Sequence, residues 1–114
     1  MQQNHTIPME PLEFIRRCVS LGKILWTYHV NMRLKGRSIS RSAIKDSCGH
    51  YEIIEPYPED KYLPSYLVRS EHQNDVLHIL FAIDVKSDNV RIITAYRPTV
   101  EEWEAGFRSR RKLS

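Results

Sequence analysis

The sequence predicts an α+β fold in which N-terminal helices pack on a four-stranded, mainly antiparallel sheet that is followed by a C-terminal helix. Three observations lead to this prediction. The spacing of apolar residues changes from helical to strand-like near residue 51. The segments after that point are joined by short polar connections, as in antiparallel hairpins. Thr99 and Glu102 then form a capping-box pattern, which indicates the start of a helix.

The first half of the chain is expected to form helices. The spacing of apolar residues predicts three of them, over residues 10–21, 23–34 and 41–48. Each is followed by a glycine, the residue most common just after a helix C-terminus: Gly22, Gly36 and Gly49. Ser40 is a suitable N-cap for the third helix, because its hydroxyl can accept a hydrogen bond from the backbone of the first turn.

The second half is expected to form the sheet. Strands are predicted over residues 51–57, 65–71, 76–85 and 90–97, with hairpin connections at 72–75 and 86–89. Alternation in the third strand places one apolar series toward the core: Leu77, Ile79, Phe81, Ile83 and Val85. The last helix is expected to continue to about residue 110.

Length and composition favour one globular domain. The chain has 114 residues, with 41% hydrophobic and 27% charged residues, a balance typical of folded domains. This length is enough for one core and too short for two. We expect a flexible lead at residues 1–9, a single domain at 10–111 and a basic end at 112–114.

The distribution of charge favours an anionic partner. The net charge is only +3, but basic residues cluster in the first helices and at the C-terminus. Such clusters attract phosphate groups, and the alternative is a solvated helix surface with a basic tail. No apolar stretch approaches the ~20 residues that span a bilayer, so no membrane is expected. Two cysteines without a CxxC spacing and a polar N-terminus favour the cytoplasm.

Several chemistries lack their usual motifs. The sequence contains neither a GxxxxGK[ST] nor a GxGxxG loop, which argues against a nucleotide cofactor. The five histidines have no metal-ligand spacing with cysteines or carboxylates, and no GxSxG elbow is present. If the protein is an enzyme, we therefore expect it to use no cofactor and no metal ion.

The second predicted helix presents a candidate phosphate site. His29 and Arg33 are four residues apart and share one helix face, and Arg37 follows just beyond Gly36. Arginine binds phosphate through two parallel hydrogen bonds, and histidine transfers protons near neutral pH. The alternative is a half-buried helix histidine beside solvated arginines.

The strands present a second group. His78 lies in the middle of the third strand on its less apolar face, where a buried polar group needs a partner. On the fourth strand Thr94 and Tyr96 share one face and Arg97 lies on the other. Basic residues of the last helix, Arg110 and Arg111, are expected to line the same cleft as Arg33. Aromatic and basic side chains together are suited to unpaired RNA, although a structural histidine is the more common arrangement.

A set of short segments extends this interpretation to a family. They are residues 23–34 (KILWTYHVNMRL), 36–40 (GRSIS), 57–60 (YPED), 64–66 (PSY), His78, 94–98 (TAYRP), 102–103 (EW) and 110–111 (RR). With them the chain resembles the domain-of-unknown-function family DUF4258 over about residues 11–111. The resemblance implies a relation to small α+β ribonucleases of the RelE, BrnT and EndoU-like group, which cleave RNA without metal by attack of the 2′-OH.

The resemblance also implies roles for particular residues. His29 would be the general base or acid and His78 the second proton-transfer group, with Tyr96 in the same catalytic cleft. The phosphate- and RNA-binding residues would be Arg33, Arg37, Thr94, Arg97, Arg110 and Arg111. The expected partners are RNA, free or on the ribosome, and an antitoxin of the zinc-ribbon and helix-turn-helix type.

Three hypotheses follow. The first is a metal-independent endoribonuclease, the toxin of a type II toxin–antitoxin pair. The second is a non-catalytic module that binds RNA or protein through the same basic cleft. The third is a small structural or regulatory domain, for which His78 would be fully buried and bonded to a backbone carbonyl.

Overall fold

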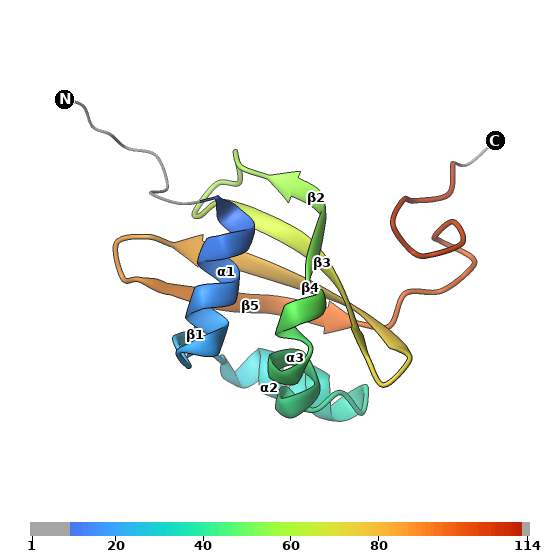
Figure 1. The fold of residues 1–114 in the computed structure, drawn as a ribbon, viewed down its shortest axis with the longest axis horizontal. Coiled ribbons are helices and arrows are strands. Elements are labelled where there is room, and N and C mark those ends of the chain that lie inside the picture. Colours follow the sequence, from blue (N-terminus) through green and yellow to red (C-terminus); the bar gives the residue numbers. More distant parts are fainter. Residues whose placement is uncertain (1–9, 113–114) are drawn as a thin grey trace.

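The computed structural model describes residues 10–112, so the expected lead at 1–9 lies outside the described residues. Its elements are α1 (Pro11–Ser20), β1 (Ile24–Leu25), α2 (Tyr28–Gly36), α3 (Arg41–Asp46), η1 (Cys48–His50), β2 (Glu52–Tyr57), β3 (Ser65–His72), β4 (Asp75–Asp84) and β5 (Asn89–Tyr96). The strands form one sheet in the order β1-β5-β4-β3-β2. Every helix within residues 10–112 precedes β2, and the fold is α+β (Figure 1).

The prediction of four strands was wrong. The short strand β1 pairs in parallel with β5, with Ile24 opposite Val90, so the sheet has five strands and is mixed. This segment was predicted to begin a helix over 23–34, but α2 begins only at Tyr28, where the Thr27 hydroxyl accepts a hydrogen bond from the Val30 backbone N–H at 3.2 Å. The spacing of two apolar residues, Ile24 and Leu25, cannot distinguish a strand from a helix. They form a strand because their backbone pairs with β5.

The prediction of a C-terminal helix was also wrong. Residues 98–111, which we call the C-terminal loop, make one turn at Thr99 and then reverse direction. Gly106 and Phe107 have φ values of +87° and +60°, and successive left-handed residues cannot continue a right-handed helix. The reversal brings Trp103, which precedes it, opposite Arg110, which follows it, in an antiparallel bridge.

The helices cover one face of the sheet (Figure 1). Helix α1 packs against β4 and β5, α2 against β5, and α3 against β3. The core lies between these two layers and includes Leu77, Ile79, Phe81 and Ile83, which confirms the predicted apolar face of β4. Val85 was expected in the same series, but it follows the end of β4 and is exposed.

The expected hairpins are present. Gln73 and Asn74 connect β3 to β4 with φ values of +53° and +67°, the two left-handed residues that a two-residue hairpin of type I′ requires. Four residues, including Asp88 at φ +55°, connect β4 to β5. None of the helices within residues 10–112 has the length and apolar character needed to cross a membrane.

Candidate functional site

The face of the sheet opposite the helices carries three rows of side chains. Strand register aligns them as Glu52, Arg69, His78 and Tyr96 in the first row, Glu55, Leu67, Leu80 and Thr94 in the second, and Tyr57, Ser65, Ala82 and Arg91 in the third. Register shifts on β2 and β5 leave Ile54 and Ile93 as extra residues, and such bulges re-aim the side chains around them.

The C-terminal loop covers the first row. The Trp103 ring lies edge-on to the His78 ring, with 4.4 Å between the centroids, and Trp103 is buried. The Arg69 Nε atom donates to the Gly106 carbonyl at 2.7 Å. Two ion pairs then join the loop to β2, Arg108 with Glu52 and Arg110 with Glu55. The first row is therefore closed to solvent at His78, whose exposure is 0%.

Both ring nitrogens of His78 have partners. The Nε2 atom lies 2.9 Å from the Phe107 carbonyl oxygen, which can only accept, so Nε2 carries the proton. Nδ1 is then an acceptor for the Tyr96 hydroxyl at 3.3 Å. Burial lowers the pKa of His78, which favours this neutral form, and burial raises the pKa of Tyr96, which keeps its phenol protonated.

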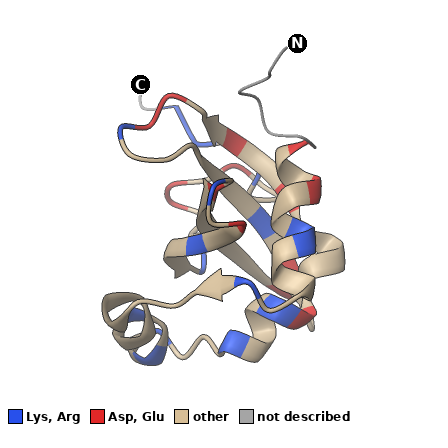
Figure 2. Cartoon of the chain, turned by 90° about the vertical axis from the view of Figure 1, so that its left-hand side faces the viewer, with Lys and Arg blue, Asp and Glu red and all other residues tan. Residues whose placement is uncertain are grey.

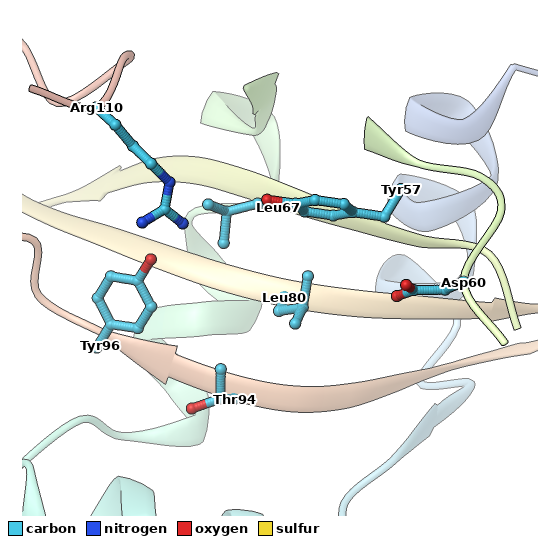
Figure 3. A pocket seen from close by; sticks show the side chains of 7 residues that line it. All are labelled: Tyr57, Asp60, Leu67, Leu80, Thr94, Tyr96 and Arg110. Atoms are coloured by element: carbon cyan, nitrogen blue, oxygen red, sulfur yellow. The ribbon is translucent and has the colours of Figure 1, made fainter. Parts of the chain in front are cut away.

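A pocket of about 310 Å³ lies over the second row and part of the third row, where Leu67, Leu80, Thr94 and Tyr57 line it. Leu67 and Leu80 form its apolar floor, and Tyr57 lies beside them (Figure 3). Tyr96 from β5 and Arg110 from the C-terminal loop point toward each other at one end, and Asp60 lies at the other. Thr94 completes the lining. We call this space the sheet-face pocket.

Hydrogen bonds hold the polar groups around the pocket. Arg110 donates from Nε and Nη2 to the Glu55 carboxylate at 2.8 and 3.1 Å, and its guanidinium lies 4.6 Å from the Trp103 ring centroid. Burial tends to raise the pKa of Glu55, but hydrogen bonds from Arg110 and Tyr57 lower it overall. The same hydrogen bond to Glu55 raises the pKa of Arg110. The guanidinium thus stays charged while its Nη1 atom is not used by Glu55.

A second arginine, from the helical layer, contacts a residue that lines the pocket. Arg37, at the C-terminus of α2, donates from Nη1 to the Thr94 hydroxyl at 3.2 Å and to the Ala95 carbonyl at 2.7 Å. Through this contact with β5, the end of α2 places the Arg37 guanidinium next to the open face of the sheet, although α2 itself packs beside β5. It places a second guanidinium next to a residue that lines the pocket.

A neighbouring pocket of about 340 Å³ shares Asp60 with the first one. Its other lining residues are Lys61, Tyr62, Leu63, Ala82, Arg91 and Ile93. Tyr62 is 85% exposed, so its ring is available for stacking. The open face therefore provides two adjacent spaces with aromatic and cationic side chains.

The structure brings together part of the predicted site. Thr94, Tyr96 and Arg110 line the sheet-face pocket, Arg37 contacts Thr94, and His78 lies directly behind Tyr96. The enclosure of His78 and its bond to a backbone carbonyl are the features expected of a structural histidine.

Other predicted residues lie elsewhere. His29 and Arg33 are exposed on α2 and do not line the pocket. His29 precedes Arg37 by eight residues, which is about 12 Å along a helix. Since His78 is enclosed, the expected pairing of His29 and His78 across one cleft is not formed.

Arg97 and Arg111 serve local structure. Arg97 pairs with Asp75 and donates to the backbone carbonyls of Arg37 and Ser38, which joins the end of α2 to the β3–β4 hairpin. Arg111 donates to the Val100 carbonyl and pairs with Glu104, both within the C-terminal loop.

Sequence reasoning missed Tyr57, Asp60, Leu67 and Leu80 as site residues. Tyr57 and Asp60 belong to the YPED run that was noted only for its resemblance. For Leu80 a signal was available, because the alternation of β4 places this apolar side chain on the same face as His78, away from the core. An apolar residue on the face not used for the core is one sign of a binding surface.

The basic clusters are paired with acidic residues only in part. Arg17 and Lys23 both bind Asp88, and the arginines of the C-terminal loop form the ion pairs described above. Figure 2 shows Lys and Arg interspersed with Asp and Glu over one side of the molecule. These ion pairs reduce the attraction for an anion around α1 and the C-terminal loop, whereas exposed Arg33, Lys35 and Arg41 of the helical layer form no ion pair within residues 10–112.

A family model matches more than half of the chain. The model of the family described as "Domain of unknown function (DUF4258)" matches residues 26–97, from just before α2 to just after β5. No curated protein and no solved structure matches the chain. Within residues 10–112, no group of three or more His, Cys, Asp or Glu side chains is arranged to hold a metal ion.

Proposed function

The chain belongs to the DUF4258 family, and we propose that it binds single-stranded RNA on the open face of its sheet and cleaves it without a metal ion. The observation that supports this most is the sheet-face pocket, in which a tyrosine backed by a neutral histidine lies beside an arginine at one end of an apolar floor. Apolar and aromatic surfaces suit an unstacked base, and guanidinium groups suit its phosphate.

The proposed reaction is an internal transfer at phosphorus. The 2′-oxygen attacks the adjacent phosphorus, the bond from phosphorus to the 5′-oxygen breaks, and the products are a 2′,3′-cyclic phosphate and a 5′-hydroxyl. The Tyr96 oxygen takes the 2′-OH proton while its own proton passes to Nδ1 of His78, and the departing 5′-oxygen takes a proton from water. The hydroxide left by that water takes the proton back from His78 through the Tyr96 hydroxyl, which restores the neutral imidazole and the protonated phenol. The Phe107 carbonyl orients the imidazole, as the third member of a catalytic triad does.

Two arginines and a threonine would bind the phosphate. Arg110 retains Nη1 for a phosphate oxygen after its bonds to Glu55, and Arg37 donates to Thr94, which lines the pocket in the adjacent row of the sheet. Charge developing on the phosphate oxygens would be stabilised by these donors, which the ion pair and the β5 backbone already hold in place.

The cellular role we propose is that of a toxin in a toxin–antitoxin pair, acting in the cytoplasm on RNA that is free or on the ribosome. Its antitoxin would be a protein of the zinc-ribbon and helix-turn-helix type. These points rest on the resemblance to RelE-type ribonucleases and are tested by the growth experiment below.

A second candidate function is supported by one observation. His78 is buried with both nitrogens engaged, an arrangement that is complete without a substrate. In that case the open face binds RNA without cleaving it. The two functions differ at Tyr96, since a binder keeps its affinity for RNA when this hydroxyl is removed.

The test is growth of a bacterium in which the wild-type chain, Tyr96→Phe or Tyr28→Phe is induced. Tyr28→Phe is the matched control, because Tyr28 is an exposed tyrosine on α2 that does not line the pocket. We expect arrest with the wild type and with Tyr28→Phe, and none with Tyr96→Phe. The loss of a proton-transfer group slows cleavage by about 100-fold or more.

The accompanying measurement is sequencing of RNA with 5′-hydroxyl ends at equal levels of the three proteins. New 5′-hydroxyl ends should appear with the wild type and with Tyr28→Phe. Continued growth and unchanged RNA ends with abundant wild-type protein would contradict cleavage. Retained RNA affinity in that case would support the binding function.

A further inference from the structure

Asp60 is an unexpected residue in a pocket proposed for RNA. It lies at the end of the sheet-face pocket opposite Arg110, and it also lines the neighbouring pocket. A carboxylate repels phosphate, so Asp60 is suited to contact the base or the sugar of a nucleotide and not its phosphate. Within residues 10–112 no Lys or Arg forms an ion pair with Asp60, so its negative charge is not neutralised by a basic side chain.

The Asp60 carboxylate is held in one orientation. The hydroxyl of Ser65, which is fully buried at the start of β3, donates to Oδ2 of Asp60. The Asp60 backbone N–H donates to the Tyr57 carbonyl at 3.3 Å and closes the turn after β2. A carboxylate has about four acceptor positions, so one bond from Ser65 leaves the others free. Figure 3 shows the carboxylate directed toward the leucine floor.

The sheet-face pocket therefore has three zones in sequence. Tyr96 and Arg110 lie at the cationic end, Leu67 and Leu80 in the middle, and Asp60 at the acidic end. Tyr96 belongs to the first row and Ser65, the partner of Asp60, to the third row, which are about 13 Å apart at the rise of a β-strand. This order matches one nucleotide, with its phosphate at the arginine, its ring on the leucines and its base edge at the carboxylate.

Among the four bases, guanine has the edge that a carboxylate matches. Its N1–H and N2–H₂ donors lie side by side on the Watson–Crick edge, and both oxygens of a carboxylate can accept from them. Adenine and cytosine present one amino donor beside an acceptor nitrogen, and uracil presents one N–H between two carbonyls. Each of these places an acceptor against the carboxylate.

From this geometry we infer that the sheet-face pocket selects guanine and that Asp60 is the specificity-determining residue. The inference rests on the proposed function, because it requires that RNA binds this face. It adds the identity of the base and the residue that reads it.

The test measures the affinity of the full chain for four labelled hexanucleotides by fluorescence anisotropy. Each is a 2′-fluoro oligouridylate, which lacks the 2′-OH nucleophile and stays intact, and its central position is guanine, hypoxanthine, adenine or uracil. Hypoxanthine differs from guanine only in lacking the N2 amino group. We expect the guanine RNA to bind most tightly and the hypoxanthine RNA about tenfold more weakly, the effect of one lost charge-assisted hydrogen bond.

The variant Asp60→Asn should bind the guanine and hypoxanthine RNAs within about twofold of each other, since an amide offers one acceptor oxygen and a donor in place of the second. Glu59→Gln is the matched control, because it removes the same charge from the adjacent exposed residue and should keep the wild-type preference.

Two outcomes separate this inference from the proposed function. Binding of all four RNAs by the wild type with equal affinity would overturn guanine selection and leave RNA binding intact. Absence of binding to any of them would overturn the proposed function and this inference with it. A guanine preference that survives in Asp60→Asn would overturn the role of Asp60.

Discussion

At the scale of single residues, the pair formed by His78 and Tyr96 shows how neighbouring side chains divide their roles. The two are opposite each other on adjacent strands, yet the C-terminal loop encloses His78 while Tyr96 still lines the pocket. A buried histidine is tolerated because both nitrogens are bonded, and the Phe107 carbonyl selects the tautomer. The tautomer leaves Nδ1 as an acceptor behind the tyrosine hydroxyl.

The lowered pKa of His78 predicts a dependence of stability on pH. Below about pH 6.5 the unfolded chain binds a proton at this histidine, whereas the folded chain resists protonation because the ring is buried. The free energy of unfolding should therefore fall as the pH drops from about 7 toward the lower folded-state pKa. Urea denaturation at pH 7.5, 6 and 5 measures this.

In His78→Gln the group that titrates is gone, so the decline between pH 7.5 and 5 should be smaller than in the wild type. The variant itself should be less stable at pH 7.5 by about 1–3 kcal/mol, because hydrogen-bond partners of the ring are left unsatisfied. Equal declines in the two proteins would show that His78 is not the group responsible.

At the scale of elements, the C-terminal loop is what makes the open face a site. It replaces a predicted helix, and its reversal at Gly106 and Phe107 returns the chain over the first row of the sheet. It also supplies Arg110, although the family match ends at residue 97. Part of the proposed site therefore lies outside the matched segment, in a loop held by the burial of Trp103.

Replacement of Trp103 should detach this loop. Trp103→Ala removes the largest buried side chain of the loop, and we expect the free energy of unfolding to fall by about 3–5 kcal/mol. Val100→Ala, at an exposed residue of the same loop, should change it by less than about 0.5 kcal/mol. Urea denaturation measures both, and a loss below about 1 kcal/mol for Trp103→Ala would show that the loop docks independently of its tryptophan.

At the scale of the whole molecule, the balance of charge predicts a weak and local attraction for RNA. The net charge is +3, and many arginines and lysines are paired with carboxylates. The logarithm of the association constant for RNA falls linearly with the logarithm of the salt concentration. The slope is about −0.7 for each phosphate that the protein neutralises on a single strand. A shallow slope is therefore expected, set by the few arginines at the pocket.

Arg37→Gln should lower that slope by about 0.7 in magnitude, because one phosphate contact is lost. Lys35→Gln removes the same charge from an exposed residue on α2 that does not line the pocket, and it should leave the slope unchanged. Anisotropy titrations of a uridine-rich 2′-fluoro RNA at several salt concentrations measure the slopes. Equal slopes for the two variants would place the phosphate elsewhere.

Local patterns in the sequence predicted a large part of the fold. The order of helices before antiparallel strands, the two hairpins and the core face of β4 all follow from the spacing of neighbouring residues. They also predicted Thr94, Tyr96 and Arg110 as candidates, because polar and aromatic residues on a strand or a basic terminus stand out without knowledge of their neighbours.

By itself, the sequence determined the type of most elements and which face of β4 meets the core. Tertiary structure alone decided that β1 pairs with β5, that the C-terminal segment folds as a loop, and that Tyr96 rather than His29 lies at the pocket. The physical reason is distance along the chain. Periodicity records interactions within a few residues, whereas strand pairing, the docking of Trp103 on His78 and the shared pocket depend on hydrogen bonds and burial between segments far apart in sequence.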